Sequence, residues 1–265
     1  MMKIYTISIH PGFMKEYFNF GVGTSSKKLG IDIEHINLRD FSVDNHASVD
    51  SPPYSEEDGM VLRPEPLSDA IKCIQGGEEK TSYVIYTAAY GTLWNNYHAK
   101  RLSQKIIEGS IDLENSYQKD RLIHECRCDK LVFICGRFSG VDQRFIDRYV
   151  DEIFSSGDFI LSGGELPVLS MIDSILRFIP GVLGNSKSNI SDSFERELEG
   201  KIEYPVYSRP QEFEGIKVPE VLLSGDHKKI KEWKKNMSLQ MTQKFRPDLL
   251  KEDIIIDETK DKSSK

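Results

Sequence analysis

The sequence has few of the features that mark secreted or membrane-spanning proteins. It contains only four cysteines in 265 residues, at positions 73, 126, 128 and 135. Residues 1–10 form a strand-length apolar alternation that is too short for a secretory hydrophobic region or a membrane span. Few cysteines without an export segment are typical of reduced thiols in a cytoplasm. We therefore expect a soluble, cytoplasmic protein without a membrane partner.

Two further absences restrict the class of ligand. The net charge of −7 and the pI near 5.5 argue against nucleic-acid binding through bulk charge, so such binding would need a local basic patch. None of the glycine loops that follow predicted strands has the form G-x-G-x-x-G or G-x-x-x-x-G-K-[ST]. A dinucleotide or a nucleoside triphosphate is thus a poor candidate, and a ligand without a pyrophosphate fits better.

Apolar segments alternate with segments of helical periodicity over the first two thirds of the chain. The predicted strands cover residues 3–9, 31–38, 83–86 and 130–135, and the predicted helices cover 13–22, 65–75, 93–109 and 166–179. Strands that alternate with helices in this way indicate an α/β domain with a mostly parallel sheet. The chain is long enough for one large domain or two modest ones with a real core.

Three glycine-containing segments follow apolar runs and could form one binding site. They are Thr87–Gly91, Gly136–Asp142 and Ser162–Pro167. Ligands of open α/β sheets bind at the carboxyl ends of strands, where such segments lie. The third segment precedes a helix whose apolar face is interrupted at its far end by one charge, Arg177. The sequence leaves two interpretations open: a small-molecule site, or a short strand at Phe159–Leu161, a turn and a core helix whose arginine extends to solvent.

Two clusters of possible metal ligands lack the expected spacing. The acidic run Glu56–Asp58 is more typical of a solvated loop than of a metal site. The segment His124–Cys128 has a C-x-C pattern but no second cluster, which a zinc site would require, so a strand edge is the better interpretation. We predict no metal site at either position.

The composition changes after Gly184. Residues 185–193 are polar and aperiodic, which indicates a linker, and residues 194–199 predict a helix. Residues 204–223 contain too many prolines for a long helix and should be extended and irregular. Helical periodicity returns at 227–239, where lysines 228, 229, 231, 234 and 235 crowd the same turns. This run is either a phosphate-binding patch or a solvated helix face.

These residues together resemble a known family, the bacterial tRNA (guanine-N1)-methyltransferases of the knotted SPOUT class, called TrmD. The resemblance covers nearly the whole chain. It rests on motifs in the same order as in the family: Arg39–Phe41, Val49-Asp50, Pro53-Tyr54, Gly59-Met60, Cys135–Arg137, Gly157-Asp158, Leu161–Pro167, Arg177–Gly184, Asp192–Phe194, Tyr207–Pro210, Val218-Pro219 and Leu222–His227.

The resemblance implies an α/β fold with a SPOUT-type trefoil knot and a smaller C-terminal helical domain. The corresponding boundaries are 1–183 for the knotted domain, 184–193 for the linker, 194–256 for the tRNA-binding domain and 257–265 for a disordered tail. It also implies a homodimer with active sites at the subunit interface, tRNA as the substrate and S-adenosyl-L-methionine (AdoMet) as the methyl donor.

Site residues follow from the same resemblance. The expected AdoMet pocket comprises Tyr86, Thr87, Ala88, Gly136, Phe138, Gly140, Ser156, Gly157, Asp158, Phe159, Ile160, Leu161, Gly163, Gly164 and Pro167. The expected tRNA-binding residues are Gly59, Met60, Arg209, Lys228, Lys231 and Lys235. AdoMet presents a neutral adenine and a sulfonium rather than phosphates, so exposed backbone groups suit it better than a lysine cradle.

The implied reaction is methylation of N1 of the guanosine 3′ of the anticodon, guanosine-37. Guanine N1 must lose a proton before it attacks the methyl group, and Asp192 matches the family's base. Arg177 matches the residue that stabilises the negative charge on guanine O6. Ser139 stands where the family has a glutamate, which leaves a magnesium requirement open. The alternative is a degenerate relative that binds tRNA or AdoMet without turnover, or that acts on another RNA.

Overall fold

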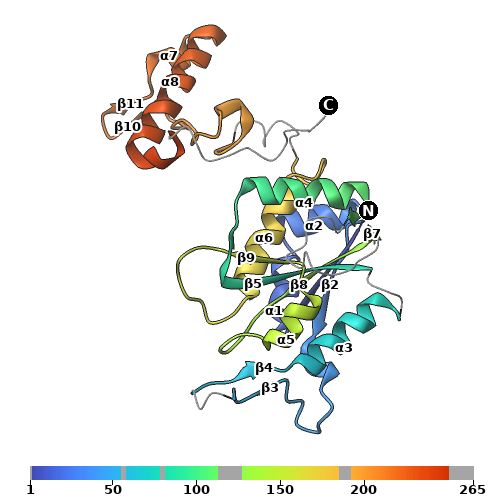
Figure 1. Cartoon of the computed structure of the whole chain (residues 1–265). Helices are drawn as coiled ribbons and strands as arrows, with labels where there is room; N and C mark the ends of the chain where they lie inside the picture. The colour runs from blue at the N-terminus through green and yellow to red at the C-terminus, as the bar shows by residue number, and fades with distance from the viewer. Residues whose placement is uncertain (1, 55–57, 78–80, 113–126, 185–191, 251–265) are drawn as a thin grey trace, which may run out of the picture. The chain divides into compact units, whose positions relative to one another are not determined.

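We describe a computed structural model of the chain over residues 2–54, 58–77, 81–112, 127–184 and 192–250 (Figure 1). The chain divides into two compact units, Met1–Ser186 and Lys187–Lys265. In the described part of the chain, no helix combines the length and the apolar character that a membrane span needs.

The first unit is built on a five-stranded sheet in the order β2-β1-β8-β5-β9. The strands are β1 (Lys3–Ser8), β2 (Ile33–Asn37), β5 (Ser82–Leu93), β8 (Lys130–Ile134) and β9 (Glu152–Ser155). Every neighbouring pair is parallel. All five strands therefore end at the same edge of the sheet, and the loops that follow them are brought together there.

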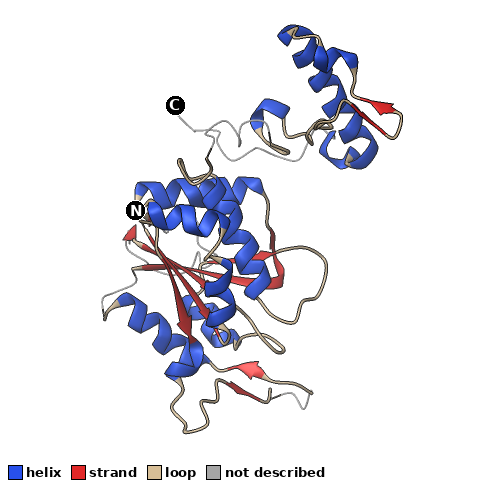
Figure 2. Cartoon of the chain, turned by 180° about the vertical axis from the view of Figure 1, so that it is seen from behind, coloured by secondary structure: helices blue, strands red, loops and turns tan. Residues whose placement is uncertain are grey.

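Helices cover both faces of this sheet (Figure 2). On one face lie α1 (Pro11–Tyr17), α2 (Gly21–Lys28), α4 (Asn96–Glu108) and α6 (Glu165–Arg177), and on the other lie α3 (Pro64–Gln75) and α5 (Gln143–Tyr149). Successive strand residues alternate between the two cores, so that Tyr83 and Ile85 face α4 and α6 whereas Val84 and Tyr86 face α3 and α5. Burial on both faces explains why the central strands are continuous apolar runs.

Two pairs of short strands and one 3-10 turn extend the first unit. The strands β3 (Asp50–Ser51) and β4 (Val61–Leu62) pair antiparallel, and so do β6 (Ile111–Asp112) and β7 (Arg127–Cys128). A 3-10 turn, η1 (Leu38–Phe41), follows β2. Cys128 is buried in β7. His124, Glu125 and Cys126 lie outside the described residues, as do Glu56 and Glu57.

The second unit centres on one long helix, α8 (His227–Phe245). Its other elements are η3 (Arg196–Leu198), β10 (Glu212–Phe213), β11 (Ile216–Lys217), α7 (Glu220–Leu223) and η4 (Pro247–Leu250). The Asp226 carboxylate caps α8 by accepting hydrogen bonds from the amides of Lys228 and Lys229, both at 3.1 Å. Two side chains of α8 bind the backbone of Ile202: the Ser238 hydroxyl donates to its carbonyl at 2.6 Å, and the Thr242 hydroxyl accepts from its amide at 3.1 Å.

The predicted mixed α/β fold with a mostly parallel sheet is confirmed, but several predicted elements differ. The helix expected at 13–22 is two helices, because Gly21 adopts a left-handed φ of 54° and Gly23 packs against the backbone of Phe18. The helix expected at 194–199 is only the 3-10 turn η3. The strand at Phe159–Leu161, one of the two interpretations left open, is not observed: these side chains are exposed, and the fifth strand, β9, precedes Gly157.

Candidate active site

A cavity of about 310 Å³ lies where β8 and β9 end and where β5 bulges. It is lined by residues 86–90, 136–140, 154–157, 159–164 and 167. This set contains 14 of the 15 residues predicted to bind AdoMet. The exception is Asp158, which does not line the cavity. The structure thus brings the three predicted glycine segments together at one edge of the sheet.

The bulge in β5 opens the first wall of the cavity. Thr87 and Thr92 both pair with Phe154 of β9, so residues 88–91 leave the ladder between them. The expected loop at Thr87–Gly91 is therefore an excursion within a long strand. A Cβ on Gly91 would lie 2.5 Å from the carbonyl carbon of Phe154, so only glycine lets the strand return this closely to β9.

Backbone contacts join the second and third walls. The amide of Gly164 donates to the carbonyl of Gly136 at 2.7 Å, and Gly163 forms a β-bridge with Arg137. Because β9 lies beside β5 and β8 lies beyond β5, the chain after β9 must cross the end of β5 to make these contacts. The Ser162–Gly164 segment is thereby held against the end of β8.

The floor of the cavity is uncharged. The Tyr86 ring lies beneath Gly136 and Gly140, and its burial raises the pKa of the phenol to about 12. Burial likewise raises the pKa of the thiol of Cys135, which lies next to the lining residue Gly136. The Thr87 hydroxyl is buried and has no hydrogen-bond partner among the described residues. Such an orphaned polar atom at a cavity wall is suited to receive a polar ligand group.

One ion pair lies at the edge of the cavity. Arg137 approaches Glu165, at the start of α6, with 3.2 Å between Nε and Oε2. The guanidinium also donates to the carbonyl of Ser162 at 2.8 Å, and the Ser8 hydroxyl donates to Glu165 at 2.8 Å. Sequence reasoning included Arg137 and Glu165 in two of the glycine segments but gave neither residue a role of its own, although a charged residue inside a glycine-rich turn was a signal for one.

The segment with Gly59 and Met60 is attached to the same edge of the sheet. The amide of Ser139 donates to the carbonyl of Met60 at 2.9 Å, and the amide of Leu62 donates to the carbonyl of Gly140 at 3.0 Å. Gly59 has a φ of 123°, and a Cβ there would lie 2.6 Å from the Ser139 hydroxyl. Two residues predicted to bind tRNA are thus in direct contact with a loop predicted to bind AdoMet.

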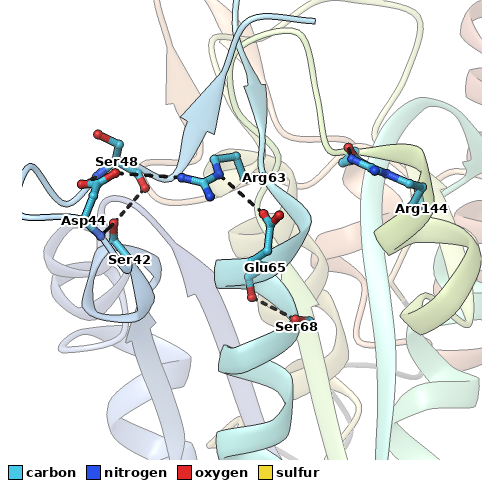
Figure 3. Close-up of polar contacts among 8 residues, drawn as sticks. Ser42, Asp44, Ser48, Arg63, Glu65, Ser68 and Arg144 are labelled. Carbon is cyan, nitrogen blue, oxygen red and sulfur yellow. Dashed lines mark hydrogen bonds and ion pairs between the residues drawn. The ribbon is translucent and has the colours of Figure 1, made fainter. Parts of the chain in front are cut away.

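Polar contacts support this segment at the start of α3 (Figure 3). The Arg63 guanidinium lies 3.5 Å from the Glu65 carboxylate and 3.9 Å from the carboxylate of Asp44. Asp44 belongs to the turn before β3. Backbone hydrogen bonds, that from Ser48 foremost, hold the pKa of the Asp44 carboxyl below its usual value. The amide of Arg63 donates to the carbonyl of Val49 at 2.8 Å. These contacts fix both strands of the β3–β4 pair from which the segment projects.

The two predicted catalytic residues belong to different units. Arg177 is the last residue of α6, where a cation is favoured by the negative end of the helix dipole. Asp192 begins a turn in the second unit, in which the amide of Glu195 donates to the Asp192 carbonyl at 3.2 Å. Ser193, the next residue, accepts a hydrogen bond from the amide of Glu203 at 2.9 Å. The expected pairing of Arg177 with Asp192 remains a prediction.

The predicted tRNA-binding residues of the second unit are solvent-exposed. Lys228, Lys231 and Lys235 lie on α8, and Arg209 precedes the β10–β11 hairpin. Lys235 lies 3.4 Å from Glu199, which offsets part of its charge. Lys228 lies in the first turn of α8, where the positive end of the helix dipole disfavours a cation. Helix stability therefore does not explain its position.

Comparison with known proteins identifies the family. The profile of the family described as tRNA (Guanine-1)-methyltransferase TrmD matches residues 2–107 and 114–252. The chain belongs to the TrmD family. A Sulfurihydrogenibium relative (strain YO3AOP1) named tRNA (guanine-N(1)-)-methyltransferase is 42% identical over 94% of this chain and 87% of its own length. A relative with the same name from Clostridium botulinum (strain Eklund 17B / Type B) is 37% identical over 98% of this chain and 97% of its own length. Another from Geobacter sulfurreducens is 40% identical over 83% of this chain and 79% of its own length.

Membership of the TrmD family accounts for the order of motifs along the chain. The profile spans both compact units, from the first strand to the end of η4. Its one internal gap, residues 108–113, includes the last residue of α4 and both residues of β6. The segments that line the cavity all fall inside the matched ranges.

Proposed function

We propose that this TrmD-family chain transfers a methyl group from AdoMet to N1 of the guanosine 3′ of the anticodon, guanosine-37, in tRNA. The observation that carries this proposal is the cavity formed by the β5 bulge, the Gly136–Gly140 loop and the Ser156–Gly164 segment. The names of the relatives supply the reaction class and the substrate. The work of such an enzyme in tRNA modification also assigns it to the cytoplasm.

The residues around the cavity suit AdoMet. The lining contains many small residues together with Phe138, Phe159 and Ile160, which can enclose a neutral adenine. The Thr87 hydroxyl offers a hydrogen bond that no described residue uses. When bound, AdoMet would supply a methyl group activated by its sulfonium, and transfer of that methyl to N1 would release S-adenosylhomocysteine, a neutral thioether. The chain's own contribution is to bind and orient the donor and to prepare the base.

Two side chains are assigned to the methyl acceptor. The Asp192 carboxylate accepts the N1 proton of guanine, and Arg177 stabilises the negative charge that grows on O6 as the proton leaves. We assign Asp192 to one subunit of a homodimer and Arg177, with the cavity, to the other. Gly59 and Met60 adjoin the cavity through Ser139 and are positioned to contact the nucleoside.

The remaining assignments concern the fold and tRNA. The return of the chain from β9 across β5 to β8 supports a trefoil knot at the cavity. The division into two units supports a knotted catalytic domain, residues 1–183, and a tRNA-binding domain, residues 194–256. In the latter, Lys228, Lys231, Lys235 and Arg209 are assigned to tRNA phosphates. A phosphate near the first turn of α8 would offset the unfavourable position of Lys228.

The test is single-turnover transfer of labelled methyl from AdoMet to unmodified tRNA with guanosine, or with adenosine, 3′ of the anticodon. We expect transfer to the guanosine tRNA alone. Parallel reactions with magnesium and with EDTA determine whether the metal is required. Transfer to neither tRNA, with AdoMet binding retained by calorimetry, would favour a relative that binds without turnover.

Variants assign the catalytic roles in the same assay. We expect Asp192→Asn and Arg177→Ala each to lower the transfer rate by about 100-fold or more, which is the range for a general base or an oxyanion-stabilising group. Arg148→Ala is the control for Arg177, because Arg148 also lies in the last turn of a helix, α5. Glu232→Gln on the exposed face of α8 is the control for Asp192. Near-normal rates for both Asp192→Asn and Arg177→Ala would remove the assignment.

A further inference from the structure

Arg137 and Glu165 stand between two cavities of the first unit. Arg137 lines the candidate AdoMet cavity and also a second cavity of about 450 Å³, which Glu165, His10 and Phe13 line as well. Ser162 and Gly163 contribute to both walls. The two cavities therefore share the wall formed by Ser162 and Gly163, and the ion pair between Arg137 and Glu165 lies against this wall.

The contacts of Glu165 link three separate parts of the sheet edge. Its carboxylate accepts a hydrogen bond from Ser8, at the end of β1, and pairs with Arg137, just beyond the end of β8. The Arg137 guanidinium in turn donates a hydrogen bond to the carbonyl of Ser162 at 2.8 Å. Glu165 is only 4% exposed and Ser8 only 1% exposed. A carboxylate buried to this extent must be paired, so the arrangement of Arg137 is strongly constrained.

The backbone of Gly163 lies directly against this pair. A Cβ at Gly163 would approach Arg137 Nε and Glu165 Oε2, each at 2.5 Å. The glycine loop and the two charged groups therefore share one contact surface, and a shift of either side chain would displace the loop. Protein interiors transmit such shifts because they are close-packed.

We propose that Glu165 is a positioning residue for AdoMet binding. It fixes Arg137, and Arg137 fixes the Ser162–Gly164 wall of the cavity. This inference rests on the proposed function, since it concerns the ligand of the same cavity. It separates Glu165 from the catalytic residues, because Glu165 acts on donor binding and not on the guanine.

The experiment measures binding of S-adenosylhomocysteine by calorimetry and steady-state methyl transfer for Glu165→Gln and Ser8→Ala. For Glu165→Gln we expect the Kd for S-adenosylhomocysteine to rise about tenfold, the effect of losing one charge-assisted hydrogen bond, and the KM for AdoMet to rise by more than that. The KM for tRNA and kcat at saturating AdoMet should stay within about twofold. Ser8→Ala, which keeps the ion pair, should raise the Kd about threefold.

Glu152→Gln is the matched control. Glu152 pairs with Arg101 at 2.6 Å in the same unit, its side chain is 17% exposed, and it lines neither cavity. The Kd of Glu152→Gln for S-adenosylhomocysteine should stay at the wild-type value. Unfolding midpoints should show that every variant is folded. Equal losses for Glu165→Gln and Glu152→Gln would reveal a general stability effect and overturn the proposal, as would wild-type binding by both Glu165→Gln and Ser8→Ala. If the wild-type protein itself does not bind S-adenosylhomocysteine, the proposed function fails and this inference fails with it.

Discussion

Replacing Gly164 by alanine tests whether the junction of the three loops builds the cavity. A Cβ at this position would lie 2.7 Å from the backbone nitrogen of Gly136, 2.7 Å from the Thr87 hydroxyl and 2.9 Å from the Cα of Cys135. Two of these three neighbours are backbone atoms of the β8 end, which cannot rotate away. The φ of −80° at Gly164 is accessible to alanine, so the effect is purely one of space.

The size of the effect follows from these contacts. Overpacking of this kind costs about 1–3 kcal/mol. Lengthening the 2.7 Å hydrogen bond from Gly164 to Gly136 adds about 1 kcal/mol. A loss of about 2–4 kcal/mol in unfolding free energy lowers Tm by roughly 4–16 °C in a chain of this size. Because the displaced atoms form the cavity wall, we expect affinity for S-adenosylhomocysteine to fall by about tenfold to 100-fold.

Calorimetric titration and thermal unfolding together check this prediction, with Gly184→Ala as the control. An added Cβ at Gly184 meets no atom within 4 Å, so that variant should bind and unfold like the wild type. Unchanged affinity and Tm in Gly164→Ala would refute the reasoning, since they would mean that the two loops are not in contact. A lower Tm with unchanged affinity would show that the junction supports the fold but not the ligand site.

Three further predictions concern single side chains. Thr87→Val should raise the free energy of unfolding by about 1 kcal/mol, because it removes a buried oxygen without a partner among the described residues, and it should weaken AdoMet binding. Thr87→Ser should change neither quantity; denaturant titration measures the stability and calorimetry measures the binding. Burial lowers the pKa of His35 to about 4, so between about pH 6.5 and 4 the unfolded chain binds a proton that the folded chain does not, and the free energy of unfolding falls as pH falls. Discounted for partial exposure, the loss of stability is about 1–2 kcal/mol. His35→Gln should therefore flatten the slope of Tm against pH. Lys228→Ser and Lys231→Ser should each reduce the slope of log affinity for tRNA against log salt by about 0.7–0.9, whereas Lys27→Ser on α2 should not.

The layered fold was predictable because the sheet is buried on both faces. Continuous apolar runs such as Leu131–Ile134 and the helical periodicity of α3 and α6 are strong local signals. The break between α1 and α2 could not be predicted from the sequence, because it depends on Gly23 packing against the backbone of Phe18. The strand β9 was missed because its short run, Glu152–Ser155, adjoins the more apolar Phe159–Leu161, which the structure exposes.

The cavity itself was predictable only in its parts. Glycine segments after strands mark loops that can bind a ligand, but their adjacency depends on the strand order, which no local pattern encodes. The support of the cavity was harder still to foresee. Ser8, Arg137 and Glu165 are separated by 129 and 28 residues along the chain and meet only because β1, β8 and α6 converge.

The charge of Arg137 yields a final prediction. Among the described residues that line the candidate AdoMet cavity, Arg137 is the charged one, and Glu165 offsets its charge. AdoMet carries a positive sulfonium, whereas S-adenosylhomocysteine carries a neutral thioether. Glu165→Gln leaves the Arg137 cation without its partner on the cavity lining, and like charges in a partly solvated site repel one another.

We therefore expect Glu165→Gln to lose more affinity for AdoMet than for S-adenosylhomocysteine, by about tenfold, in paired calorimetric titrations. The difference should shrink as salt is raised, because the edge of the cavity is open to solvent ions. Ser8→Ala, which leaves both charges in place, should weaken the two ligands equally. An equal loss for both ligands in Glu165→Gln would show that the carboxylate acts through the position of the loop alone and that its charge does not influence the choice between donor and product.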